Sequence, residues 1–252
     1  MHDLLRPRAL LRHGLVLTVV VTCVALGQWQ LSRLAEIREV NARLEERLAE
    51  PSVDLVALDP LPSAGAPPDD DRVAALEFRA VVARGTWRTD LEVLQRNREH
   101  LGESGFHVLT PLELDDGRLV LVRRGWVPSH LDEPPVSEAA PADGPVTVHG
   151  VLERPVSPPS FGPRDLDQGH LDRVFYPDTA RLAGQMDGAL IAPVLRMSAV
   201  DPAGAGDLPL ALDGPRLDER NHQSYAVQWF TFALLAAVTY VVWLRRSDRT
   251  NR

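Results

Sequence analysis

Residues 14–29 read GLVLTVVVTCVALGQW, an apolar run without a charged residue. With the next two residues the run has 18 members, close to the roughly 20 that cross a bilayer core of about 30 Å. A second run, YAVQWFTFALLAAVTYVVWL at 225–244, has 20 residues and no charge. A buried core helix is the alternative for each run, but both runs lie near the chain ends and end in basic residues. We therefore predict two transmembrane helices, over 14–31 and 223–244.

The arginines of the two tails predict how these helices are oriented. Residues 1–13 carry a net charge of +2 and residues 245–252 carry +3, whereas the stretch between them carries −13. Arginine-rich tails next to a span stay on the cytoplasmic side. We expect a multi-pass protein of the cell membrane, with cytoplasmic tails over 1–13 and 245–252 and an extracytoplasmic main domain.

The first apolar run has a second interpretation, as a cleaved signal peptide. Arginines precede it, and Ala25-Leu26-Gly27 offers small residues at a cleavage site. Against cleavage, the run continues without a turn signal into QLSRLAEIREVNARLEERLAE, whose apolar residues recur at steps of three and four. We favour one uncleaved helix from about Gly14 to Glu50, amphipathic over 32–50 and ended by Pro51.

The middle of the chain predicts a β-rich domain. Residues 51–75 are rich in proline and contain Asp69-Asp70-Asp71 without the spacing of a calcium loop, so we expect a solvated linker there. From residue 76, runs such as LEFRAVVARGTWR and RLVLVRRGWV have the composition of strands, Asp115-Asp116-Gly117 predicts a hairpin, and 171–188 reads as a short helix. The predicted fold class is an α+β membrane protein, with two transmembrane helices bracketing an antiparallel β-rich domain over 76–222.

The composition excludes several kinds of chemistry. All 27 basic residues are arginine, which excludes Schiff-base lysines and Walker-type phosphate loops. Cys23 is the single cysteine, so an intramolecular disulfide and a thiolate zinc site are excluded. The net charge of −8 disfavours nucleic acid as a partner. Asp165 and Asp167 could pair as acid and base, but any acidic protein offers such pairs, and no hydrolase, metalloprotease or dinucleotide motif is present. We predict no enzyme and no catalytic residue.

One histidine has a distinctive context. His222 lies in ERNHQSYAVQWF at the outer mouth of the second span, where an ionisable group is costly enough to suggest a function. The alternative is an ordinary helix start capped by Asn221. A neutral imidazole at this depth could instead ligate the iron of a porphyrin between the spans. The residues expected around such a cofactor are Tyr225 and Trp229 on the same helix, and Trp29 and Gln30 at a similar depth on the first span.

Four motifs resemble the surfeit-locus-one (Shy1-like) family of cytochrome c oxidase assembly factors. They are LGQWQLSRL at 26–34, the strand pair around Gly85-Thr86-Trp87, LVLVRRGWVP at 119–128 and NHQSYAVQWF at 221–230. Arg123 departs from the family, which usually has asparagine at that place. The resemblance implies two spans bracketing a β-rich domain, a role in maturing the haem–copper oxidase of the respiratory chain, and no catalysis.

The resemblance also implies a cofactor and partners. Haem a would be bound transiently, with His222 as ligand to its iron, taken from the haem a synthase and passed to oxidase subunit I. The motif residues expected to contact a partner or support the fold are Gly85, Trp87, Arg124, Gly125, Trp126 and Asn221. Two alternatives remain open at this point: a haem-free scaffold, or chaperone, for subunit I, and a two-span sensor or adaptor facing outward.

Overall fold

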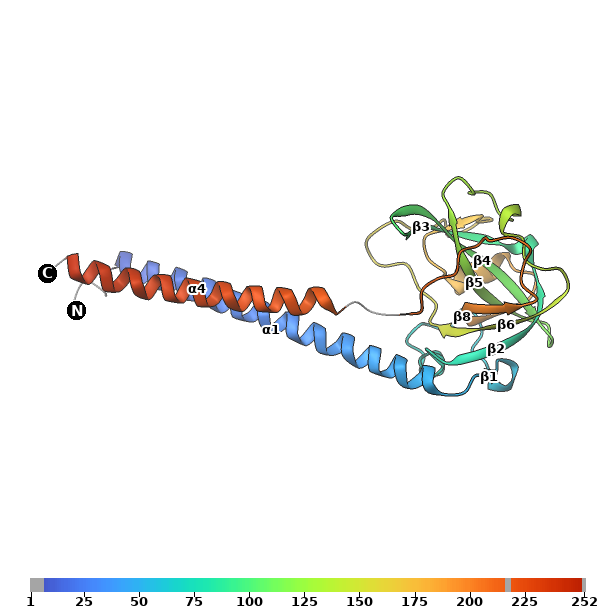
Figure 1. Cartoon of the computed structure of the whole chain (residues 1–252), viewed down its shortest axis with the longest axis horizontal. Helices are drawn as coiled ribbons and strands as arrows, with labels where there is room; N and C mark the ends of the chain where they lie inside the picture. Colours follow the sequence, from blue (N-terminus) through green and yellow to red (C-terminus); the bar gives the residue numbers. More distant parts are fainter. Residues whose placement is uncertain (1–6, 216–218, 251–252) are drawn as a thin grey trace. The chain divides into compact units, whose positions relative to one another are not determined.

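The computed structural model describes residues 7–215 and 219–250, and the chain divides into two compact units. The helical unit comprises the chain up to Glu45 and from Pro215 onward, and the sheet unit comprises Glu46–Gly214. Each unit has its own packing, and each is described by itself below (Figure 1).

The helical unit consists of α1 (Pro7–Ala49), whose last turn enters the sheet unit, and α4 (Arg220–Thr250). Both helices are long and apolar enough to cross a membrane, and only 11% and 6% of their most apolar windows are buried in the protein. This confirms two candidate spans by length and composition. The prediction of one continuous helix ending before Pro51 is also confirmed.

The two helices pack side by side and antiparallel, as Figure 1 shows. A Cβ added to Gly27 would lie 2.8 Å from the ring of Phe230, so the α1 backbone comes close to α4 at this point. Small side chains permit such an approach between helices in lipid. The other buried residues of this seam include Cys23, Leu34, Ala226 and Ala233.

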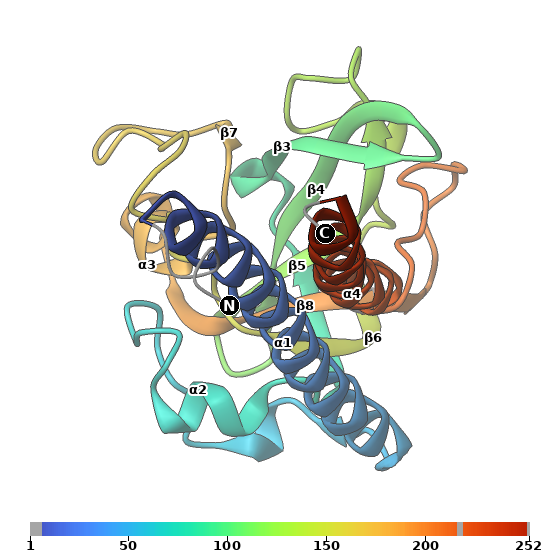
Figure 2. The same ribbon diagram turned by 90° about the vertical axis from the view of Figure 1, so that its left-hand side faces the viewer.

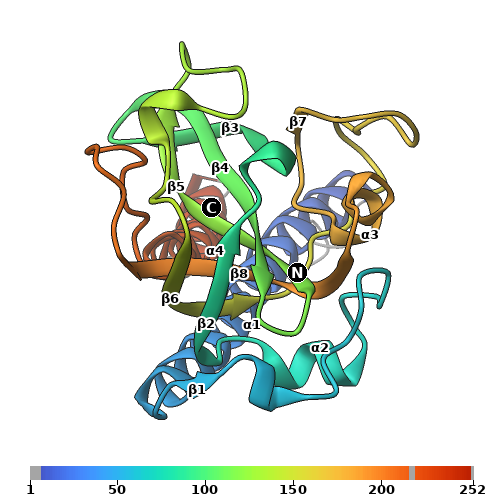
Figure 3. The same ribbon diagram turned by 90° about the vertical axis from the view of Figure 1, so that its right-hand side faces the viewer.

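The sheet unit is built on one mixed sheet of eight strands. They are β1 (Val53–Asp54), β2 (Ala80–Trp87), β3 (Val93–His100), β4 (Glu103–Leu114), β5 (Arg118–Pro128), β6 (Pro145–Glu153), β7 (Arg173–Val174) and β8 (Ala189–Asp201). Their order is β1-β2-β6-β8-β5-β4-β3-β7, and a further pairing of β2 with β4 closes five of them into a ring (Figure 3).

The prediction of an antiparallel domain is wrong in one respect, because the sheet is mixed. The pairs β1–β2, β3–β7 and β5–β8 are parallel, and the other pairs are antiparallel. The connection between β6 and β8 contains β7, α3 (Thr179–Leu182) and a 3-10 helix at Ala183–Gln185, and it returns the chain so that β8 runs beside β5 in the same direction. Strand patterns in a sequence carry no information on direction, which a long connection decides.

Three apolar clusters fill the sheet unit, of which two are large. Inside the ring lie the buried side chains of Leu112, Val122, Val148 and Leu195, among others. A second cluster around Leu109, Leu121 and Leu182 lies between the sheet and the α3 segment. The predicted hairpin at 115–117 joins β4 to β5, with Gly117 at a φ of 82°. The predicted short helix within 171–188 is α3, capped by Asp178.

The prediction of a solvated linker over 51–75 is also wrong, because this segment packs against the sheet unit. Leu55 is fully buried, and Val73 is 1% exposed. The segment forms β1, a 3-10 helix at Val56–Leu58 and the start of α2 (Asp71–Leu76), which lie on the same side of the sheet unit in Figures 2 and 3. Within the aspartate run, Asp70 caps α2 by accepting the Arg72 N–H. The apolar residues between the prolines provide the packing surface.

The closure of the ring generates a prediction for Gly85. A Cβ added to Gly85 would lie 2.0 Å from the backbone oxygen of Glu113 on β4. Gly85→Ala should therefore push β2 and β4 apart and lower the free energy of unfolding by about 1–3 kcal/mol or more. Gly184→Ala is the control, because a Cβ there meets nothing within 4 Å. Thermal unfolding of the purified full chain measures both, and equal midpoints for Gly85→Ala and wild type would contradict the ring closure.

Candidate functional site

His222 lies in the first turn of α4 and contacts α1. Its Nδ1 atom is 2.8 Å from Oε1 of Gln30, and the contact is partly buried. A carbonyl oxygen can only accept, so Nδ1 is the donor in this contact, and in the neutral form of the ring Nε2 is then the nitrogen with a lone pair. Hydrogen bonds of this kind fix the tautomer and ring orientation of metal-binding histidines. The contact leaves Nε2 as the nitrogen of His222 that can bind a metal.

Further polar contacts join α1 to the residue before α4, about two to three helical turns beyond Gln30. Arg38 Nε donates to Glu219 Oε2 at 3.1 Å, and Asn41 Nδ2 donates to Glu219 Oε1 at 3.2 Å. Glu219 immediately precedes α4, where a negative charge is favourable beside the N-terminal end of the helix dipole. We call the contacts of Gln30, Arg38 and Asn41 with His222 and Glu219 the His222 layer.

A second polar contact lies near the other end of both helices. The Tyr240 hydroxyl is 2.6 Å from His13 Nδ1, and the Arg12 guanidinium lies over the Trp243 ring at 5.2 Å. At 1.5 Å per helical residue, Gln30 lies about 26 Å from His13 along α1, and His222 lies about 27 Å from Tyr240 along α4. The polar links therefore bracket a segment of about the thickness of a hydrocarbon core.

The other residues predicted around His222 have different surroundings. Tyr225 and Trp29 are 51% and 58% exposed. Trp229 is partly buried and meets Phe232 edge-on at 6.0 Å. The alternative in which Asn221 caps the helix is wrong, because α4 begins one residue earlier and Asn221 lies exposed inside its first turn. The structure thus brings Gln30 to His222 and leaves aromatic faces open to lipid or to a ligand.

These residues fit a porphyrin with one protein ligand better than a bare metal ion. The described residues contain no group of three histidines, cysteines or carboxylates that could hold a metal. His222 offers one nitrogen donor, and Tyr225 and Trp29 offer exposed apolar rings. An iron porphyrin brings four nitrogen ligands of its own and needs an axial ligand and an apolar surface.

Arg124 and Trp87 belong to a buried network inside the sheet unit. The side chains of Arg124 and Glu92 are 4% and 1% exposed, and Nη1 of Arg124 lies 3.2 Å from Oε2 of Glu92. Arg124 Nη2 donates to the Ala139 carbonyl at 2.6 Å, and the guanidinium lies 5.4 Å from the centre of the Trp87 ring. Burial lowers the pKa of Arg124, and Glu92 opposes this effect.

Glu92 is the centre of this network, and it was missed in the sequence. It accepts from Arg124, from the Thr110 hydroxyl at 2.6 Å and from the Val136 N–H at 2.8 Å. The network therefore joins β4, β5 and the loop around residues 136–139. A lone glutamate between apolar residues in LEVL was the available signal.

Gly125 and Trp126 fix the segment after β8 to the sheet. Trp126 is 3% exposed, its backbone exchanges hydrogen bonds with Leu210, and its Nε1 donates to the Arg98 carbonyl at 3.1 Å. A Cβ on Gly125 would lie 2.5 Å from the Leu210 oxygen. The Gly-Trp motif thus has a structural role in the described chain, and its side chains are not free to meet a partner.

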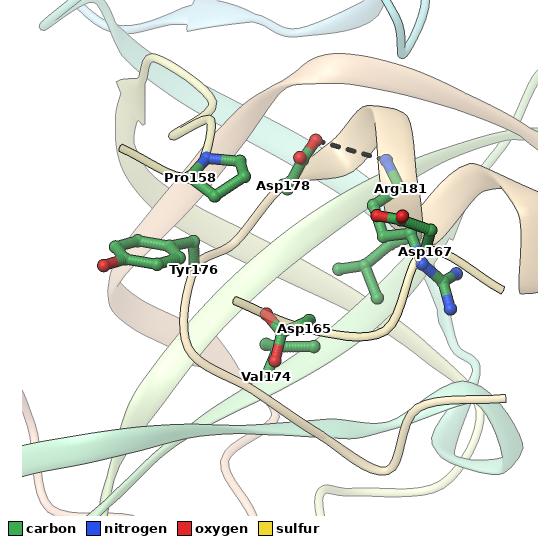
Figure 4. Close-up of a pocket in the computed structure, with 8 residues that line it drawn as sticks. Pro158, Asp165, Asp167, Val174, Tyr176, Asp178 and Arg181 are labelled. Carbon is green, nitrogen blue, oxygen red and sulfur yellow. Dashed lines mark hydrogen bonds between the residues drawn. The ribbon is translucent and has the colours of Figure 1, made fainter. Parts of the chain in front are cut away.

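Two carboxylates of a small pocket beside α3 accept hydrogen bonds from the backbone and so stabilise the local fold. It has a volume of about 60 Å³ and is lined by Pro158, Asp165, Asp167, Val174, Tyr176, Asp178, Arg181 and Leu182 (Figure 4). Asp165 accepts the Phe175 N–H, and Asp178 caps α3 by accepting the Arg181 N–H. The suggested acid–base pairing of Asp165 with Asp167 gains no support from these contacts.

Comparison with known proteins identifies relatives over most of the chain. A sequence model described as the SURF1 family matches residues 17–234. An uncharacterized SURF1-like protein of Mycobacterium tuberculosis is 29% identical over 238 residues, which are 93% of this chain and 83% of the relative. A SURF1-like protein of Drosophila melanogaster is 27% identical over 250 residues, 92% of this chain and 76% of the relative. A SURF1-like protein of Rickettsia bellii is 26% identical over 238 residues, 91% and 90% of the two chains.

The buried network predicts a large loss of stability for Arg124→Ala. Removing the guanidinium leaves the Glu92 carboxylate buried and unpaired, which typically costs about 3–5 kcal/mol. Arg84→Ala is the control, because its ion pair with Asp54 is exposed and should contribute less than about 1 kcal/mol. Denaturant unfolding of the full chain measures both variants. Similar losses of stability would show that the buried Arg124–Glu92 pair contributes no more than the exposed Arg84–Asp54 pair.

Proposed function

Because the chain belongs to the SURF1 family, a family of assembly factors, we propose that it assists the maturation of haem–copper cytochrome c oxidase. In this proposal it binds haem a and helps its delivery to oxidase subunit I. Its partners are subunit I, the haem a synthase and the lipid bilayer, and it catalyses no reaction itself.

The observation that carries the haem part of the proposal is the contact between His222 and Gln30. It keeps the proton on Nδ1 and leaves the lone pair of Nε2 for iron. Haem a, when bound, supplies the redox-active iron and a broad apolar ring. The chain supplies the axial nitrogen at His222 and apolar rings at Tyr225, Trp229 and Trp29.

A single protein ligand suits a carrier. Delivery requires that the chain release the haem, and one imidazole gives fewer bonds to break than two would. Gln30 contributes by holding the ring in one orientation, so the imidazole loses little rotational freedom on binding. Gln30 is therefore a positioning residue in this proposal, and His222 is the ligand.

The membrane orientation is part of the proposal. The arginines of both tails favour the cytoplasmic side, and α1 and α4 then place the His222 layer at the outer side of the membrane. The sheet unit, which follows α1 and precedes α4, is extracytoplasmic in this arrangement.

Reporter fusions test the orientation. A reporter that is active only in the cytoplasm should be active at both termini and silent when inserted at Gly184, an exposed residue of the sheet unit. Activity at the inserted position together with silent termini would reverse the orientation. Loss of the N-terminal reporter by cleavage near Gly27 would show that the first run is a signal peptide.

Absorbance of the purified full chain tests the haem site. His222→Ala should remove the Soret band that haem a gives the wild-type protein, and Gln30→Leu should weaken haem binding by about 10–100-fold, as loss of a residue that orients a metal ligand does. Gln30→Glu keeps an acceptor for Nδ1–H and should retain haem.

His13→Ala is the matched control for that experiment. It removes a histidine of the same helix pair and its contact with Tyr240, but it lies in the other polar layer. It should keep the haem at wild-type stoichiometry. If His222→Ala still binds haem at full occupancy, His222 is not the ligand. A wild-type protein without any haem would favour the scaffold alternative.

A further inference from the structure

One face of the sheet unit collects guanidinium groups that are poorly matched by carboxylates. Arg123 of β5 and Arg196 of β8 are register partners on neighbouring parallel strands. Both use the same carboxylate: Arg123 Nη1 is 3.2 Å from Glu153 Oε2, and Arg196 Nε is 2.6 Å from Glu153 Oε1. Two cations therefore share one anion.

Arg98 adds a third cation, brought to the group by an irregularity in β3. The register of β3 on β4 shifts between Gln95 and Arg98, and Asn97 has a φ of 57°. A bulge of this kind re-aims the side chain that follows it. Arg98 makes no ion pair among the residues that the structure describes, and its Nη2 reaches only the Phe175 carbonyl, at 3.4 Å. We call Arg98, Arg123, Arg196 and the neighbouring His107 the arginine cluster.

The arginine cluster leaves buried hydrogen-bonding atoms without partners. Nε of Arg98, Nε of Arg123 and Nδ1 of His107 are buried and make no hydrogen bond in the described structure. Such atoms are rare in folded proteins, and an ion or a water molecule commonly satisfies them. Two of these three atoms are guanidinium donors, and unmatched cationic donors in one group favour an anion.

The electrostatics of the cluster also favour an anion. Burial lowers the pKa of His107 to about 3, with further contributions from Arg123, Arg98 and Arg196. Burial also lowers the pKa of Arg123, where attraction by Glu153 is opposed by Arg196 and Arg98. The group is therefore self-repelling, and a bound anion would relieve the repulsion.

The charge of the sheet unit as a whole makes this face exceptional. Residues 46–214 hold 28 carboxylates against 15 arginines, a formal net charge of −13. An acidic domain has no general attraction for anions, so only a local site can bind one. Many of its other arginines are paired with carboxylates, as Arg88 is with Asp90 and Asp187.

The short link between the arginine cluster and α4 favours one kind of anion. Arg196 Nη1 donates to the carbonyl oxygen of Asp213 at 2.6 Å, and Asp213 precedes the first residue of α4 by only seven positions. α4 is one of the two helices with the length and composition of a span. Phosphates of lipid headgroups are the anions most concentrated near such a chain, and guanidinium groups bind phosphate with paired hydrogen bonds.

We propose that the arginine cluster of Arg98, Arg123, Arg196 and His107 is a binding site for the phosphate of an anionic phospholipid headgroup. Binding there would fix one face of an otherwise acidic unit against the membrane surface. The site is independent of the haem proposal, since it uses none of the residues of the His222 layer.

A titration of the full chain with lipid tests this site. The protein in neutral detergent micelles receives phosphatidylglycerol or phosphatidylcholine, and its thermal midpoint is followed. Phosphatidylglycerol should raise the midpoint of the wild type more than phosphatidylcholine does. Arg98→Gln should weaken the apparent affinity for phosphatidylglycerol about tenfold, the effect of losing one charge-assisted contact.

Matched variants separate the arginine cluster from a general charge effect and from the haem site. Arg84→Gln removes the same charge from an exposed pair with Asp54 and should respond like the wild type. Arg98→Gln leaves no carboxylate without its described partner, and Arg123→Gln, whose Glu153 still keeps Arg196, repeats the test if Arg98→Gln alone fails to fold. His222→Ala should keep the lipid response, and Arg98→Gln should keep the haem, so the two proposals fail separately.

Three results would overturn the proposal. Equal responses to phosphatidylglycerol in Arg98→Gln, Arg123→Gln and wild type would place the lipid elsewhere, for example on the tail arginines. No response in the wild type would mean that the cluster binds no headgroup. Stabilisation by inorganic phosphate, but not by phosphatidylglycerol, would assign the cluster to free phosphate.

Discussion

Polar groups inside a bilayer have no water to bind, so they must find partners within the protein. The candidate spans α1 and α4 meet this constraint at two levels. Gln30 binds His222 at one level, and His13 binds Tyr240 at the other. Between the levels the seam is apolar and narrow, with Gly27 against Phe230. The two hydrogen bonds therefore fix how far α4 can slide along α1, and they give Nδ1 of His222 a defined partner.

In the sheet unit, too, buried polar groups find partners within the protein, here through a network of several side chains and backbone groups. Its buried charges, Glu92 and Arg124, are surrounded by donors and acceptors from β4, β5 and the loop at 136–139. Its ring closes where Gly85 lets β2 approach β4. The motif residues of the sheet thus support the fold, and three of the buried nitrogens without a described partner lie together in the arginine cluster.

Features that depend on local sequence were predictable. The uncharged runs predicted both long helices, Pro51 predicted the end of α1, and the Asp-Gly turn predicted the hairpin between β4 and β5. The depth of Gln30 relative to His222 followed from counting residues through the membrane from either side, and the two side chains do meet. The family was recognisable from four short motifs, and the matched range 17–234 agrees with it.

Features that depend on distant contacts were not predictable. The direction of β8 is decided by a connection of more than thirty residues, and the burial of Leu55 by a surface that forms only in the folded sheet. Glu92 looks like any strand-edge glutamate until Arg124 and Thr110 surround it. The arginine cluster likewise joins residues from β3, β4, β5 and β8, which no sequence spacing relates.

The central claim is that Nε2 of His222 binds the iron of haem a while Gln30 holds Nδ1. Pulsed electron paramagnetic resonance on the haem-loaded full chain, prepared with isotope-labelled histidine, measures it most directly. We predict coupling of the iron spin to one histidine nitrogen, lost in His222→Gln and kept in His13→Gln. Coupling that survives in His222→Gln, or a spectrum without histidine coupling in the wild type, would contradict the claim.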